Sequence, residues 1–86
     1  MEKYTIDVRG IPVSKRVKRI SKRLDGVPVG ESLLIIADGN KVLQLVSEVI
    51  ASTKTTEFVK LFKGEDGSYH IIVKRVHTRG LNRYVG

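Results

Sequence analysis

An uninterrupted run of apolar residues lies near the middle of the sequence, from Leu33 to Ala37. A membrane-spanning helix needs about 20 apolar residues, whereas this run has the length of a strand. Both faces of such a strand are apolar, so it must be covered on both sides or paired along both edges. The run therefore predicts a central strand, and the rest of the chain must supply the elements around it.

A helical pattern precedes this strand. Its apolar residues fall within about 60° of one another on a helical wheel and predict one buried stripe. They are Val13, Val17, Ile20 and Leu24. Ser14 is a plausible N-cap, while Gly26 and Pro28 supply a stop.

A second helical pattern follows the strand, over residues 41–52. Asp38 and Asn40 are its two candidate N-caps. Its predicted buried stripe consists of Val42, Val46, Val49 and Ile50.

Three further segments read as strands. Residues 4–8 alternate around β-branched side chains, and two β-rich runs, 57–63 and 68–76, flank the turn residues 64–67. The predicted order is β-α-β-α-β-β. Two helices packed on one face of a four-stranded mixed sheet would bury both helical stripes, which makes an α/β fold of the two-layer α+β sandwich type.

The chain has 86 residues, which favours one domain, and we place it at residues 1–76. Residues 77–86 lack periodicity and contain two arginines, so we expect a basic, flexible C-terminal tail. The first nine residues do not resemble a signal peptide. We expect a cytoplasmic protein without a membrane segment.

The absence of cysteine excludes disulfides, thiolate nucleophiles and sulfur-based zinc sites within this chain. The two histidines, His70 and His77, match no metal-ligand spacing. Residues 38–41 lack the glycine spacing of a phosphate loop, and no serine is placed beside a base. We therefore expect no metal, no cofactor and no catalytic activity.

Several segments resemble the TusA/SirA-like family of small sulfur carriers. The run Asp7-Val8-Arg9-Gly10-Ile11 is similar to the opening motif of that family, residues 30–38 to its second strand and residues 67–75 to its final hairpin. The resemblance implies the same β-α-β-α-β-β fold. This element order also resembles that of the C-terminal domain of bacterial initiation factor three, which binds ribosomal RNA, as an analogy of fold only.

The sequence departs from the family at the position that carries its chemistry. Counted from Asp7, the cysteine that carries sulfur in the family falls on Val13, and the two family prolines fall on Ser14 and Arg16. Valine cannot carry sulfur. The resemblance therefore implies a non-catalytic member of the family, in which Val13 opens the buried stripe of the first helix.

Six basic residues occupy the side of the first predicted helix opposite its apolar stripe. They are Lys15, Arg16, Lys18, Arg19, Lys22 and Arg23. No acidic residue lies among them, and like charges four residues apart each destabilise a helix by about 0.2–0.5 kcal/mol. The chain also has a net charge of +7. We therefore expect a surface for a polyanion, RNA or DNA first, bound mainly through phosphates.

Further basic residues extend this expected surface toward the C-terminus. They are Arg75, Arg79 and Arg83, with His77 and Tyr84 beside them. Arg9 is instead expected to pair with Asp7 or Asp38.

Two other interpretations of the charge stay open. One is a solvated helix face without a ligand, and the other is a protein-docking or regulatory component of a sulfur-relay or redox system that has lost its cysteine. A homodimer through the edge strand of the final hairpin is compatible with either.

Overall fold

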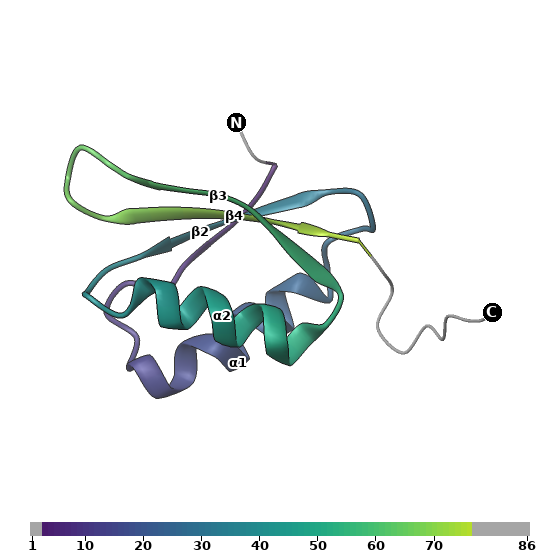
Figure 1. Cartoon of the computed structure of the whole chain (residues 1–86), viewed down its shortest axis with the longest axis horizontal. Helices are drawn as coiled ribbons and strands as arrows, with labels where there is room; N and C mark the ends of the chain where they lie inside the picture. The colour runs from purple at the N-terminus through teal and green to yellow at the C-terminus, as the bar shows by residue number, and fades with distance from the viewer. Residues whose placement is uncertain (1–2, 77–86) are drawn as a thin grey trace.

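The computed structural model describes residues 3–76 of the chain, and its elements follow the predicted order (Figure 1). The helices are α1 (Val13–Leu24) and α2 (Val42–Thr53), and the strands are β1 (Tyr4–Asp7), β2 (Ser32–Ala37), β3 (Thr56–Lys63) and β4 (Tyr69–Arg75). The predicted basic tail, residues 77–86, lies outside the described residues.

The four strands form one mixed sheet in the order β1-β2-β4-β3. Strand β1 pairs with β2 in parallel, whereas β4 runs antiparallel to both of its neighbours. The prediction that β2 is central is confirmed, because it pairs along both edges. Strands β1 and β3 are consequently the two edges of the sheet.

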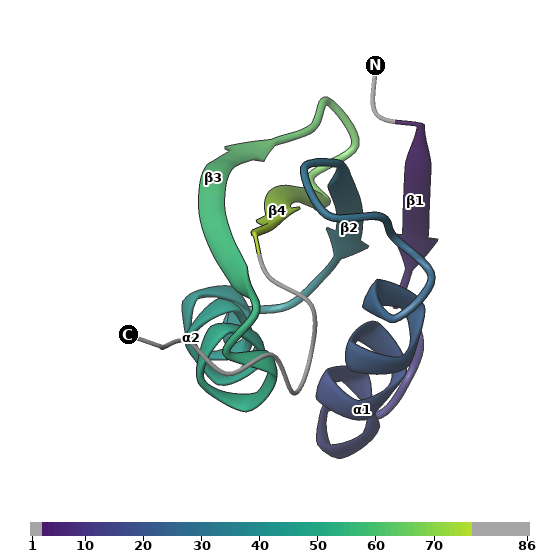
Figure 2. The same cartoon turned by 90° about the vertical axis from the view of Figure 1, so that its right-hand side faces the viewer.

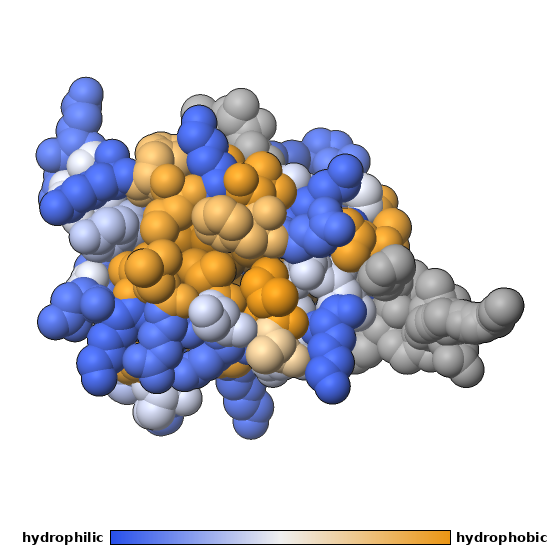
Figure 3. Space-filling model, viewed as in Figure 1, coloured by the Kyte–Doolittle hydropathy of each residue, from blue (hydrophilic) through white to orange (hydrophobic). Residues whose placement is uncertain are grey.

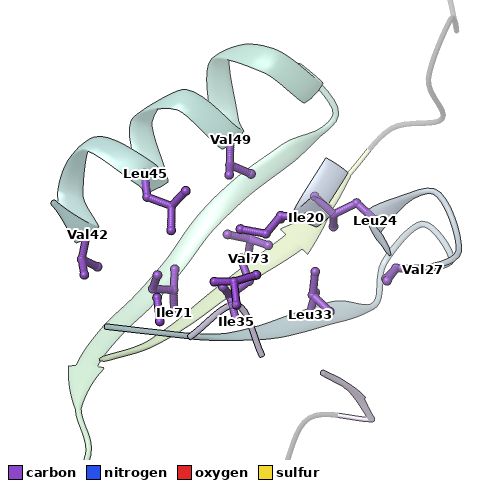
Figure 4. Close-up of a cluster of buried hydrophobic side chains, with 12 residues drawn as sticks. Ile20, Leu24, Val27, Leu33, Ile35, Val42, Leu45, Val49, Ile71 and Val73 are labelled. Carbon is purple, nitrogen blue, oxygen red and sulfur yellow. The ribbon is translucent and has the colours of Figure 1, made fainter. Parts of the chain in front are cut away.

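Both helices cover the same face of the sheet, as predicted (Figure 2). Helix α1 lies on the side of β1, and α2 lies on the side of β3. The core fills the space between the layers with buried side chains from both helices and both central strands (Figure 4). They include Ile20, Leu24, Leu33, Ile35, Leu45, Val49, Ile71 and Val73. Each strand of the central pair contributes every second residue, which is the period of a strand.

The predicted N-caps are wrong. Helix α1 begins directly after Pro12 and α2 directly after Lys41, and neither helix has a side-chain cap. The carboxylate of Asp38 is instead engaged by Arg16, whose Nη2 donates to Asp38 Oδ1 at 2.7 Å. Pro12, which lacks an N–H group, costs α1 no hydrogen bond, because the first N–H groups of a helix have no intrahelical partner.

The predicted helical stripes need correction at particular residues. Val13 is 55% exposed, so it does not open the buried stripe of α1. It borders a hollow between the starts of the two helices, and the buried Arg16 lines the same hollow. In α2, Leu45 lies in the core, whereas Val46 and Ile50 are only partly buried.

Candidate nucleic-acid interface

A groove on the outer face of α1 is lined by four basic side chains and by no other residue of the range 3–76. We call it the basic groove, and its residues are Lys15, Lys18, Arg19 and Lys22. They stand three and four positions apart, which places them on one helical face, and they span about 10 Å along the helix axis. None of them forms an ion pair with any residue between 3 and 76. Their charges are therefore open to a ligand.

The basic surface continues from the groove toward the edge of the sheet. A second hollow is lined by Arg19, Lys22 and Arg23 together with Gly26 and Ile6 of β1. The guanidinium of Arg23 lies 5.6 Å from the ring centroid of Tyr4, and its Nε donates to the carbonyl oxygen of Thr5 at 3.4 Å. Packing against β1 thus holds this cation at the rim of the groove.

Arg16 does not belong to the basic surface, contrary to the sequence prediction. Its side chain is buried, at 7% exposure for the residue. It donates hydrogen bonds to the carbonyl oxygens of Ile11 (2.8 Å) and Asp38 (2.9 Å) and forms an ion pair with the Asp38 carboxylate. The guanidinium is engaged by loops at the end of the sheet, so it is not available to a ligand.

Arg75 is also a structural residue, again contrary to the prediction. It is 8% exposed, and its Nη1 donates to the carbonyl oxygens of Leu24 (2.7 Å) and Val27 (3.0 Å). Leu24 is the last residue of α1, and terminal helix carbonyls have no intrahelical donor. The Leu24 carbonyl also accepts from the N–H of Val27 (3.0 Å), so Arg75 adds a second donor at this helix end.

The other predicted basic residues, Arg79 and Arg83, lie outside the described residues, as do His77 and Tyr84. The contribution of the C-terminal segment to the basic surface stays a prediction.

Arg9 pairs with Asp7, as predicted, at 2.6 Å. Its second partner is Asp66 in the β3–β4 turn, at 3.2 Å, and no ion pair joins Arg9 to Asp38. Hydrogen bonds from the Arg9 side chain and backbone lower the pKa of Asp7 to about 2. The pKa of Asp66 is lowered too, chiefly by hydrogen bonds from Ser68. The positive charge of Arg9 is thus paired with two carboxylates, and the cluster shares no residue with the basic groove.

Within residues 3–76 no helix is long and apolar enough to cross a membrane. Neither the protein-family models nor the curated proteins searched contain a match to this chain. Membership of the TusA/SirA-like family therefore stays a prediction that rests on the motifs quoted above.

Proposed function

We propose that this protein is a non-catalytic polyanion-binding module whose ligand is RNA or DNA. The observation that carries the proposal is the basic groove, which is lined by four cations that form no ion pair with residues 3–76. Arg23 contributes a fifth cation at its rim. The chain resembles a sulfur-carrier family but has valine in place of the family's cysteine, which agrees with a role in binding rather than in group transfer.

The energetics of α1 support a binding role for these charges. Lys15–Arg19 and Lys18–Lys22 are like-charge pairs four residues apart, and each costs about 0.2–0.5 kcal/mol. Lys15 also lies in the first turn, where no acidic residue offsets the positive end of the helix dipole. Because the arrangement lowers the stability of the helix, stability does not account for it.

The composition of the groove indicates how it would bind. Lysine and arginine contact phosphates, and the described residues of the groove include neither an aromatic residue for base stacking nor an amide for adenine readout. Binding would be strongly dependent on salt and weakly dependent on sequence.

The test is fluorescence anisotropy with labelled duplex and single-stranded oligonucleotides at 50 and 200 mM salt. Neutralising four phosphates gives a slope of log K against log salt of about −3.6 on duplex DNA, which is a loss of affinity of about 100-fold over this range. The variant with Lys15, Lys18, Arg19 and Lys22 changed to Gln should lose binding on all sequences alike.

A matched control removes the same charge elsewhere. Lys41, Lys54, Lys60 and Lys74 are all exposed and lie outside α1. Changing these four to Gln should leave most of the affinity intact. Equal losses in the two variants, or no binding at 50 mM salt, would contradict the proposal.

A further inference from the structure

A second exposed surface lies on the opposite edge of the molecule from the basic groove, where α2 meets β3. Leu43 of α2 is 70% exposed and Phe58 of β3 is 49% exposed. Figure 3 shows a continuous hydrophobic area over these two elements, bordered by hydrophilic side chains. Large exposed apolar areas on a small domain commonly mark a site of interaction.

Helix geometry and strand register place particular residues on this surface. Leu43, Val46 and Ile50 lie within about 60° of one another on the wheel of α2, beside its buried stripe. Phe58 and Leu61 pair with Val73 and Ile71, whose side chains are buried against the helices. Paired residues point to the same face of a sheet, so Phe58 and Leu61 face the helix layer. We call Leu43, Val46, Ile50, Phe58 and Leu61 the apolar flank.

Strand β3 is built to resist pairing with another strand. Its pairing with β4 is interrupted by a bulge between Phe58 and Lys60, and the intervening Val59 is 52% exposed. Lys60 and Lys63 follow on the same edge strand. A bulge and lysines are the features that natural edge strands use to prevent strand addition. A partner would therefore contact the side chains of the apolar flank and not the backbone of β3.

The charges around the apolar flank indicate the chemistry of that partner. Exposed lysines lie at the two ends of the flank: Lys54 directly follows α2, and Lys63 of β3 pairs with Tyr69 and so faces the helix layer, as Phe58 and Leu61 do. Glu57, the one acidic residue of β3, pairs with Lys74 and faces the other side of the sheet. In the described α2 the one acidic residue, Glu48, lies away from the flank and accepts a hydrogen bond from Gln44. A second copy of the chain would bring the same lysines together, and each copy carries a net charge of +7. Charge complementarity thus favours a partner rich in carboxylates.

We infer that the apolar flank is a docking site for an acidic amphipathic helix of another protein. Such a helix inserts apolar side chains spaced three and four residues apart into the surface between α2 and β3. Its carboxylates then face the lysines at the rim. This site is independent of the basic groove, because α1 and β1 form one edge of the molecule while α2 and β3 form the other.

The experiment uses a fluorescein-labelled helical peptide of leucine and glutamate, with its leucines three and four residues apart. One control peptide carries lysine in place of glutamate, and another has the same composition in scrambled order. The full chain is titrated at 150 mM salt. The acidic amphipathic peptide should bind at least about 10-fold more tightly than either control.

Variants of the chain locate the site. Leu43→Ser together with Phe58→Ser should weaken peptide binding about 10-fold or more, since removing a central apolar contact costs more than 1 kcal/mol. Both side chains are about half exposed or more, so the fold should persist, and circular dichroism checks it. Lys54→Gln with Lys63→Gln should weaken binding of the acidic peptide and leave binding of the lysine peptide unchanged. Lys15→Gln with Lys22→Gln, which alters only the basic groove, should leave the affinity for the acidic peptide unchanged.

Other outcomes would overturn the inference. Equal affinity for the acidic and the lysine peptide, or no binding of the acidic peptide, would remove the proposed partner chemistry. A dimer in sedimentation equilibrium that Leu43→Ser dissociates would assign the flank to a second copy. Weaker binding of an oligothymidine probe to the Leu43→Ser, Phe58→Ser variant would assign it to nucleic acid.

Discussion

Two buried arginines fasten helix α1 at its two ends. Arg16 bonds to Ile11 and Asp38 near the start of the helix, and Arg75 bonds to the carbonyl oxygens of Leu24 and Val27 at its end. The five donors of a guanidinium suit it to several acceptors at once. These two arginines orient the helix that carries the basic groove, while the groove residues remain exposed.

Arg16 and Arg19 should respond oppositely to the same substitution. Arg16→Gln should lower the free energy of unfolding by about 2 kcal/mol, because buried hydrogen bonds to a charged group are lost and carbonyl oxygens are left without a donor. Arg19→Gln should change it by less than about 0.5 kcal/mol, as exposed substitutions usually do, yet it should weaken oligonucleotide binding. Urea unfolding and anisotropy measure the two effects. Similar stability changes in both variants would contradict the buried role of Arg16.

Ser21 offers a stabilising substitution. Its hydroxyl oxygen is buried and has no hydrogen-bond partner among the described residues. Ser21→Ala should raise the free energy of unfolding by about 1 kcal/mol, since it removes an unsatisfied polar atom and improves helix propensity. Ser47→Ala, at an exposed position of α2, measures the propensity effect alone. A gain no larger than that of Ser47→Ala would mean that the Ser21 hydroxyl is satisfied in solution.

Asp7 should make the free energy of unfolding depend on pH in the acid range. Arg9 lowers the pKa of Asp7 in the folded chain to about 2, from 3.8 in the absence of these contacts. The Asp7–Arg9 pair therefore stabilises the fold above pH 3.8, and this contribution disappears as the pH falls toward 2. Asp7→Asn should reduce stability at pH 7 and flatten its fall between pH 5 and 2. Urea midpoints measured across this range give the comparison. Parallel curves for the two proteins would show that the pair has no effect on stability.

At the scale of elements, α1 combines a stable inner stripe with an outer face that opposes helix formation. Lys15→Glu should raise the free energy of unfolding by about 1 kcal/mol, because it places an acidic residue in the first turn and creates an attractive pair with Arg19. The same change should weaken oligonucleotide binding. Thermal unfolding and anisotropy on one preparation would show both effects. Lys41→Gln, outside the groove, serves as the control for binding, and a Lys15→Glu chain that binds normally would contradict the role of the groove.

The elements themselves could be predicted from the sequence because their signals are local. The second helix was expected over residues 41–52 and occupies Val42–Thr53, a difference of one residue at each end. The periods of 3.6 and 2 residues each require only a short window of sequence. The N-caps could not be predicted, because the carboxylate of Asp38 is taken by Arg16, 22 residues away along the chain.

The candidate site could be predicted only in part, because some of its residues are placed by contacts between distant parts of the chain. Charge and spacing identify the cations of α1, but Arg16 and Arg19 carry the same charge and differ only in what surrounds them. The burial of Arg75 depends on the end of α1, and the apolar flank depends on the pairing of β3 with β4. The exposed Leu43, next to the first residue of the buried stripe of α2, is the one local signal for that flank.

At the scale of the whole molecule, the sheet order separates the two proposed binding surfaces. Binding to the basic groove and to the apolar flank should therefore be nearly additive. A saturating concentration of the acidic peptide should change oligonucleotide affinity by less than about twofold, as for independent sites. Anisotropy with and without peptide measures this. Strong competition would indicate that the acidic peptide occupies the basic groove.

The position of β4 has a consequence for the synthesis of the chain. It is the last strand of residues 3–76, yet it lies between β2 and β3 and joins them. While a ribosome is still making residues 69–75, β3 has no strand to pair with and α1 lacks the bonds from Arg75. Because non-local pairing must wait for both partners, the sheet cannot assemble in the order of translation. Folding of this domain should be a late, all-or-none event that follows the emergence of β4 from the ribosome.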